Sequence, residues 1–183
     1  MYRALTLKVI EEKIDPKDVA QVIDLASKTG IELLNYPDSP LKVLLDGRDV
    51  TKEIRQPRIT RLVSDIAKIK DIRQIMLKLQ RKLGTQRDGV LEGRDIGTVV
   101  FPDAYKKFYL DAQFQERVSR RYKELNALGQ QVSMEAVAED LRNRDTIDSN
   151  RQFAPLKKAE DAIYIDTTQM TIKEVVTKIL SYI

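Results

Sequence analysis

The strongest constraint on the fold is the alternation of short apolar strands with helical segments in the second half of the chain. Strand character is concentrated in three segments, Gly89–Leu91, Lys107–Leu110 and Ala162–Ile165. Helical spacing of apolar residues marks three others, Gln113–Leu128, Ser133–Asn143 and Thr171–Tyr182. Because strands that alternate with helices are typical of parallel sheets, we predict an α/β fold.

Three further helices are predicted in the first half. Apolar residues recur at helical spacing over Met1–Lys13 and over Thr60–Leu83, the latter through a heavily charged background. Between them, Asp15 followed by Pro16 is typical of a helix cap and first turn, and Gly30 is typical of the end of that helix.

A small antiparallel sheet is predicted in the same half. Ile31–Tyr36 and Leu41–Leu45 have the length and composition of short strands. Asp46 and Gly47 then predict a hairpin turn, because both residue types tolerate positive φ.

Composition limits the chemistry and the class of protein. The 183 residues contain no cysteine and no histidine, which excludes disulfides, thiolate or imidazole metal ligands and histidine general bases. No apolar run is long enough to span a membrane and no signal-peptide pattern is present, so we expect a cytoplasmic protein. The chain length favours a single domain. A nucleic-acid-binding module is an alternative suggested by the net charge of +4, but no basic stripe interleaved with aromatic residues supports it.

The first candidate site lies between two glycines, directly after a predicted strand. Gly93 and Gly97 bracket Arg94 and Asp95, and glycines permit the close approach of a ligand. In open α/β sheets, ligands bind beyond the carboxyl ends of strands, where Arg94 and Asp95 would project. The alternative is a tight turn with an exposed ion pair.

The second candidate site combines arginines and aspartates near the end of a predicted helix. Arg144, Asp148 and Arg151 have the spacing that brings them together on a helix or at its end. Guanidinium groups bind phosphates in a bidentate manner, so these residues suit a lid that closes over phosphates and neutralises charge during phosphoryl transfer. The alternative is a solvated helix end with intrahelical ion pairs.

Several separated segments together resemble the bacterial-type cytidylate kinase family. The resemblance rests on GRDIGTVVFPDA at residues 93–104, on Arg144-Asp145 followed by Asp148 and Arg151, on Tyr2-Arg3-Ala4 and on Ala154-Pro155-Leu156. It covers essentially the whole chain and implies a P-loop nucleoside-monophosphate-kinase fold with a parallel sheet flanked by helices. It also implies a nucleotide-binding insert with the small antiparallel sheet at about residues 14–59 and a lid at about residues 129–155.

The resemblance implies a role for each matching residue. Ser64, Arg73 and Asp95 would read cytosine, while Arg3, Arg94 and Arg151 would hold the phosphate of CMP. Arg144 would face the phosphates and Asp148 the ribose, and the residues expected to act in catalysis are Arg144, Asp148 and Arg151. The implied reaction transfers the γ-phosphoryl group of ATP, with Mg²⁺, to CMP or dCMP. A monomer is expected, with no protein ligand set for a metal and no nucleic-acid or membrane partner.

The P-loop of this family is not found in the sequence. None of the seven glycines is followed by lysine, so the Gly-x4-Gly-Lys-Ser/Thr pattern is absent. We expect a strand, loop and helix of about 35 residues to precede this chain in the native gene, and we expect the chain alone to be inactive and poorly stable. The alternative is a non-catalytic CMP-binding pseudo-enzyme that has lost ATP binding.

Overall fold

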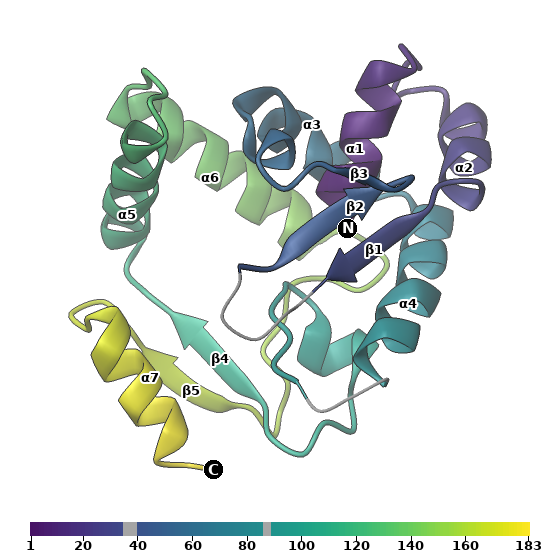
Figure 1. Ribbon diagram of the computed structural model, residues 1–183. Coiled ribbons are helices and arrows are strands. Elements are labelled where there is room, and N and C mark those ends of the chain that lie inside the picture. Colours follow the sequence, from purple (N-terminus) through teal and green to yellow (C-terminus); the bar gives the residue numbers. More distant parts are fainter. Residues whose placement is uncertain (35–39, 86–88) are drawn as a thin grey trace. The chain divides into compact units, whose positions relative to one another are not determined.

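The computed structural model describes residues 1–34, 40–85 and 89–183, and its contacts divide the chain into two compact units. The first unit comprises Met1–Leu91 and the second comprises Glu92–Ile183. Figure 1 shows the helices and strands of both units, coloured along the sequence. The prediction of a single domain stays a prediction, since a division by contacts does not show whether either unit folds alone.

The first unit combines helices with a three-stranded antiparallel sheet. Its strands pair in the order β1-β2-β3, with Ile31 opposite Leu45 and Leu44 opposite Asp49. The elements are α1 (Tyr2–Glu11), α2 (Val19–Ser27), β1 (Ile31–Leu34), β2 (Lys42–Leu45), β3 (Arg48–Asp49), the 3-10 turn η1 (Glu53–Arg55), α3 (Pro57–Ala67) and α4 (Lys70–Gly84).

The predicted hairpin is confirmed by its backbone angles. Asp46 and Gly47 have φ of 49° and 83°, the conformation that a tight two-residue turn between β2 and β3 requires. The predicted strand Ile31–Tyr36 is described only as far as Leu34, and its last two residues lie outside the described part of the chain.

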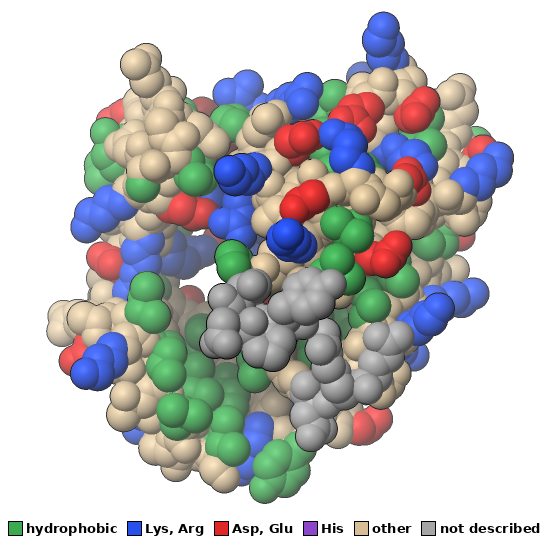
Figure 2. All heavy atoms as spheres, viewed as in Figure 1, with side chains coloured by type: hydrophobic (Ala, Val, Ile, Leu, Met, Phe, Trp, Pro, Cys, Tyr) green, Lys and Arg blue, Asp and Glu red, His purple; other side chains and the backbone are tan. Residues whose placement is uncertain are grey.

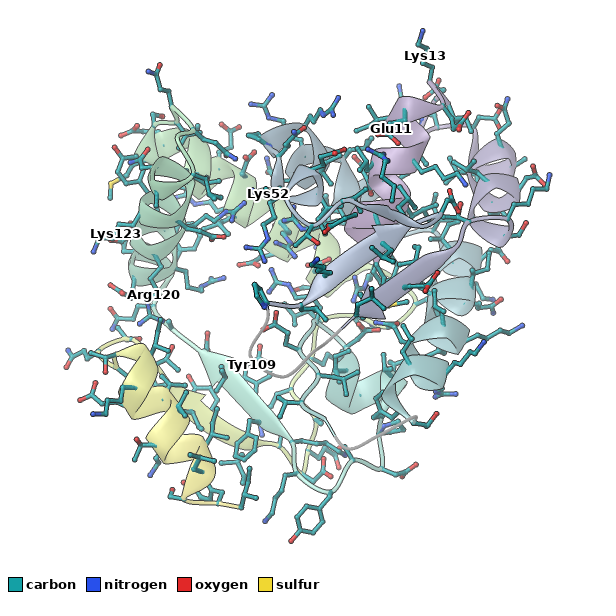
Figure 3. All side chains as sticks on the ribbon, viewed as in Figure 1. Glu11, Lys13, Lys52, Tyr109, Arg120 and Lys123 are labelled. Atoms are coloured by element: carbon teal, nitrogen blue, oxygen red, sulfur yellow. The ribbon has the colours of Figure 1, made fainter. Side chains whose placement is uncertain are left out.

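The core of the first unit is built around α1. Leu5 and Leu7 are fully buried, and so are Val22 of α2, Ile59 of α3 and Ile72 of α4. Glu11 lies near the carboxyl end of α1 (Figure 3). It accepts hydrogen bonds from Arg48 of β3, whose guanidinium also donates to Glu53 of η1. Apolar burial and these peripheral ion pairs therefore hold the helix against the hairpin.

Two helix boundaries in the first unit differ from the sequence-based expectation. The second helix begins after Asp18, not at Asp15, because the Asp18 carboxylate accepts the Gln21 amide at 3.0 Å while Asp15 instead closes the preceding turn through Lys17. The predicted single helix over Thr60–Leu83 is two helices, α3 and α4. They separate where Ile69 adopts an extended conformation with ψ of 119°.

An ion pair between α1 and the hairpin gives a testable pH dependence. Lys8 Nζ lies 2.6 Å from Asp46 Oδ2, and this contact together with the Gly30 amide lowers the pKa of Asp46 below its usual 3.8. A lowered carboxyl pKa stabilises the fold above the unfolded-state pKa, and this stabilisation is lost as the pH falls through the folded-state value. Asp46 is 45% exposed, so we expect only about 0.5 kcal/mol.

The expected result is that Asp46→Asn lowers the free energy of unfolding at pH 7 and has progressively less effect below pH 3.8. Urea denaturation of both proteins across this range measures the difference. Asp24→Asn, at an exposed residue of α2 that pairs with Lys28 at the end of the same helix, is the control. A constant difference at every pH would contradict the assignment.

The second unit contains the parallel strands that the sequence predicts. β4 (Phe108–Asp111) and β5 (Ile163–Asp166) pair in parallel, with Phe108 opposite Ile163. The helices are α5 (Phe114–Ala127), α6 (Met134–Asn150) and α7 (Ile172–Leu180), and a single π-helical turn, η2, spans Ile96–Val100. The predicted α/β class is confirmed, and Gly129 ends the α5 segment with φ of 73° as expected.

One predicted strand is absent from the second half. Residues Gly89–Leu91 are described and form no strand, and the side chain of Val90 is 99% exposed. A strand exists only where its backbone groups pair with a neighbour, and no described strand pairs with this segment. The apolar composition of these residues was therefore a misleading signal.

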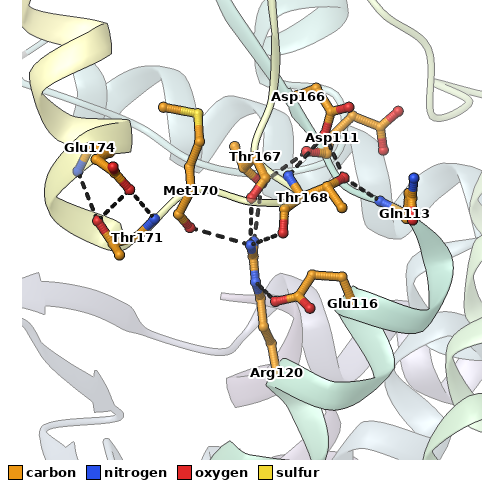
Figure 4. Close-up of polar contacts among 10 residues, drawn as sticks. All are labelled: Asp111, Gln113, Glu116, Arg120, Asp166, Thr167, Thr168, Met170, Thr171 and Glu174. Atoms are coloured by element: carbon orange, nitrogen blue, oxygen red, sulfur yellow. Dashed lines mark hydrogen bonds and ion pairs between the residues drawn. The ribbon is translucent and has the colours of Figure 1, made fainter.

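A polar network joins α5 to the loop between β5 and α7. Arg120 donates to the hydroxyl and carbonyl oxygens of Thr167 at 3.0 and 2.5 Å (Figure 4). Nε of Arg120 also donates to Oε1 of Glu116 at 2.8 Å. Thr171 and Glu174 then form a capping box that starts α7. Hydrophobic side chains gather on the surface over β4 and β5 (Figure 2), where Leu110 and Tyr164 are both about half exposed.

Candidate functional site

A tight turn presents Arg94 and Asp95 in the second unit. A Cβ atom on Gly93 would lie 2.9 Å from Cγ1 of Ile96, so a larger residue here would force the Ile96 side chain to shift. The chain then enters η2, where the amide of Val100 donates to the carbonyl of Asp95 at 3.2 Å. Single π-helical turns are frequent at functional sites because they change the direction of the backbone locally. Asp95 is buried, while the side chain of Arg94 is 32% exposed.

Helix α6 carries the second set of predicted residues. Ser133 caps its start as predicted, by accepting the amide of Ala136 at 3.1 Å. The helix runs to Asn150 and not to Asn143 as the sequence suggested. Arg144, Asp145 and Asp148 therefore all lie within the helix, where the four-residue spacing of Arg144 and Asp148 permits an ion pair.

Asp148 is the centre of the cluster. Its carboxylate is 5% exposed and lies within ion-pair distance of three guanidinium groups. Oδ1 accepts a hydrogen bond from Nη1 of Arg151 at 3.1 Å. Oδ2 lies 3.3 Å from Nε of Arg94 and 3.7 Å from Nε of Arg144. One buried carboxylate thus gathers arginines from the glycine-bracketed turn, from α6 and from the residue that follows α6.

The segment after α6 holds Arg151 in place. Arg151 leaves the helix in an extended conformation, and its Nε donates to the carbonyl of Ala154 at 2.6 Å. The amide of Leu156 returns to the carbonyl of Asp148 at 2.8 Å. Arg151 Nη2 also lies 4.0 Å from Oδ1 of Asp95. Ala154 and Leu156 therefore bind the end of α6 by two hydrogen bonds, and Arg151 links this second candidate site to Asp95 of the first.

The charges of the cluster favour an anionic ligand. Four guanidinium groups, those of Arg94, Arg117, Arg144 and Arg151, are opposed by the three carboxylates of Asp95, Asp145 and Asp148, which leaves one positive charge in excess. Burial, followed by the charge of Arg94, lowers the pKa of Arg144 from its usual value. Arginine remains charged in proteins, so a phosphate bound beside Arg144 would relieve this unfavourable environment.

The remaining predicted residues lie in the first unit. Arg3 donates from Nη1 to the carbonyl of Ile54 at 3.1 Å and to the hydroxyl of Thr60 at 3.0 Å. Arg73 is 3% exposed, donates to the carbonyl of Ala67 at 3.1 Å and has its guanidinium 5.3 Å from the ring centre of Tyr2. Ser64 is buried on α3. All three are therefore ordered and buried or half-buried positions, unlike ordinary surface polar residues.

Sequence reasoning assigned no role to two residues of the cluster in the second unit. Arg117 on α5 donates to Oδ2 of Asp145 at 2.5 Å, and its guanidinium lies 5.4 Å from the ring centre of Phe114. Asp145 also lies 3.5 Å from Nη2 of Arg94. Asp145 was recognised only as part of the Arg144-Asp145 motif, and nothing in the sequence pattern distinguished Arg117 from the other arginines of α5.

A preformed metal cage is not found in residues 1–34, 40–85 and 89–183, which contain no group of three or more acidic side chains arranged to hold a metal ion. In enzymes that act on nucleotides, Mg²⁺ is held by substrate phosphates together with one or two carboxylates, so a preformed cage is not required. No helix in the same ranges is long and apolar enough to cross a membrane.

Arginines gathered around a buried carboxylate on an α/β scaffold, three of them partly exposed, have the chemistry that suits a phosphorylated ligand. The chain matches the Cytidylate kinase family over residues 1–183. It is 46% identical to the cytidylate kinase of Clostridioides difficile strain 630 over 183 residues, covering 100% of this chain and 82% of that protein. The cytidylate kinase of Caldanaerobacter subterraneus subsp. tengcongensis is 45% identical over 179 residues, with 98% and 78% coverage.

A third relative, the cytidylate kinase of Bacillus velezensis strain FZB42, is 44% identical over 183 residues, with 100% of this chain and 81% of that protein covered. The chain therefore belongs to the cytidylate kinase family and is by family a phosphotransferase. The predicted family is confirmed, and the mixed α/β structure with parallel strands agrees with the nucleoside-monophosphate-kinase fold.

Proposed function

We propose that the chain binds CMP or dCMP as the acceptor of the γ-phosphoryl group of ATP, with Mg²⁺ supplied alongside the ATP phosphates. The observation that carries this proposal is the arrangement around Asp148, where one buried carboxylate contacts Arg94, Arg144 and Arg151. Phosphoryl transfer requires positioning and stabilisation of charge more than covalent participation by the protein. An arginine cluster with excess positive charge meets that requirement.

The proposed roles divide by chemistry. In the second unit, Arg94 and Arg151 hold the phosphate of CMP, Arg144 faces the transferred phosphoryl group and Asp148 binds the ribose. Asp95 accepts a hydrogen bond from the exocyclic amino group of cytosine, as carboxylates do when proteins read this base. Arg3 as a phosphate ligand, and Ser64 and Arg73 as cytosine ligands, are proposed from family membership.

Nucleotide titration tests the proposal. Isothermal titration calorimetry is expected to show one CMP or dCMP bound per chain and at least about tenfold weaker binding of UMP, a difference of about 1.4 kcal/mol. UMP carries a carbonyl where CMP has the amino group, which sets two acceptors against each other at Asp95. Equal binding of CMP and UMP would contradict the role of Asp95, and no binding of CMP would refute the proposal.

Transfer from ATP is measured separately. Incubation of the chain with ATP, Mg²⁺ and CMP, followed by separation of CDP, distinguishes a kinase from a protein that binds CMP without turnover. The expected inactivity and poor stability of this chain, its cytoplasmic location, its monomeric state and its lack of a nucleic-acid partner stay predictions.

A further inference from the structure

Asp145 occupies a position in the second unit that the proposed ligand contacts do not explain. It lies on α6, between an arginine of the glycine-bracketed turn and an arginine of α5. Oδ1 is 3.5 Å from Nη2 of Arg94, and Oδ2 accepts a hydrogen bond from Nη1 of Arg117 at 2.5 Å. Its side chain is 23% exposed, so much of its surface is removed from water. Three segments that are distant in sequence therefore meet at this carboxylate.

The two contacts of Asp145 differ in strength. The contact with Arg117 is a short charge-assisted hydrogen bond, and the guanidinium of Arg117 is itself packed over the ring of Phe114. Arg142 approaches the same ring, with 4.8 Å from its guanidinium carbon to the ring centre. The Arg117 side is thus anchored by α5, and it fixes the position of the carboxylate.

The Arg94 side is looser. Its distances of 3.5 Å to Asp145 and 3.3 Å to Asp148 both exceed the roughly 2.8 Å of a tight charge-assisted hydrogen bond. Nη2 of Arg94 faces Asp145 and Nε faces Asp148. Neither of these two contacts uses Nη1, which can donate to a ligand. The carboxylates of Asp145 and Asp148 therefore orient the guanidinium of Arg94 and still leave it able to donate to a ligand.

We infer that Asp145, anchored by Arg117, is a positioning residue that aims Arg94 at the phosphate of the acceptor nucleotide. This inference rests on the proposed function, in which Arg94 holds that phosphate. Asp145 itself does not touch the ligand. Its contribution is to keep the guanidinium of Arg94 preorganised, so that binding the phosphate does not first require the side chain to be ordered.

The direction in which Asp145→Asn changes the affinity for CMP distinguishes a positioning role from an effect of net charge. Replacing Asp145 with asparagine removes a negative charge from a cluster that already has an excess positive charge. If only net charge mattered, the affinity for CMP would rise. If Asp145 positions Arg94, the affinity for CMP falls while the affinity for cytidine, which has no phosphate, stays unchanged.

The experiment compares CMP and cytidine binding to the full chain and to Asp145→Asn, by calorimetry for CMP and by an NMR titration for the weaker cytidine. We expect CMP binding to weaken by about tenfold, equivalent to about 1.4 kcal/mol, with cytidine unaffected. Asp145→Glu, which keeps the charge, is expected to recover part of the loss. Asp140→Asn, at an exposed acid of the same helix, is the matched control and is expected to leave both ligands unchanged.

A second variant tests the anchor. Arg117→Met keeps an apolar stem against Phe114 and removes the hydrogen bond, and it is expected to weaken CMP binding selectively. If Arg117 acts through Asp145, the double variant is no weaker than the single variants. Additive losses, stronger CMP binding, or equal losses for CMP and cytidine in Asp145→Asn would overturn the inference. Failure of the unmodified chain to bind CMP would instead refute the proposed function, and the inference with it.

Discussion

Asp148→Asn is expected to weaken CMP binding by about 100-fold or more, equivalent to about 2.7 kcal/mol, and to destabilise the chain at the same time. The substitution preserves the shape of the side chain but removes the charge that three guanidinium groups share. Removing one partner of a fully buried ion pair costs about 3–5 kcal/mol of stability. Of the three arginines only Arg151 is as buried as Asp148, while Arg94 and Arg144 are 32% exposed, so we expect a cost at the lower end of that range. Arg94, Arg144 and Arg151 would then repel one another.

Calorimetry with CMP and urea denaturation measure the two effects. Binding is compared at a temperature at which circular dichroism shows the variant to be folded, so that loss of affinity is not loss of fold. Glu139→Gln, at an exposed acid of the same helix, is the control and is expected to change the free energy of unfolding by less than about 0.5 kcal/mol. Wild-type affinity in Asp148→Asn would show that the cluster is not the acceptor site.

Most residues of this cluster could be predicted from the sequence, but the contacts between them could not. The glycine-bracketed turn and the motif ending in Arg151 were visible because their residue types and spacings are local features of the chain. The bridge from Asp145 to Arg117 was not visible, because it joins residues that are 28 positions apart. Which arginine of α5 meets α6 depends on how the two helices pack, and the charge pattern does not encode this.

The fold shows the same division between local and non-local information. Turn chemistry was predicted correctly at Asp46 and Gly47, because the required φ angles depend on the residues themselves. The break between α3 and α4 was missed, since apolar spacing continues through it without glycine or proline. Arg73 helps to explain the break, because its guanidinium donates to the Ala67 carbonyl at the end of α3. That contact belongs to the packed structure.

The position of α1 leads to the second large expected effect. The sequence predicts a helix over Met1–Lys13 from apolar residues at helical spacing. In the structure, burial also extends to Ala4, Thr6 and Leu7, so α1 is enclosed on more than one face. Leu7 is 0% exposed and belongs to the core cluster shared with α2, α3, α4 and the small sheet.

Leu7→Ala is accordingly expected to lower the free energy of unfolding by about 2–5 kcal/mol, from the lost burial of the side chain and from the cavity that remains. Urea denaturation followed by circular dichroism measures the change. Leu41→Ala removes the same atoms from a side chain that is 46% exposed and is expected to cost less than about 1 kcal/mol. Equal effects of the two substitutions would mean that α1 is not part of the stable core, and the helix that carries Arg3 would then not be a fixed support for a ligand.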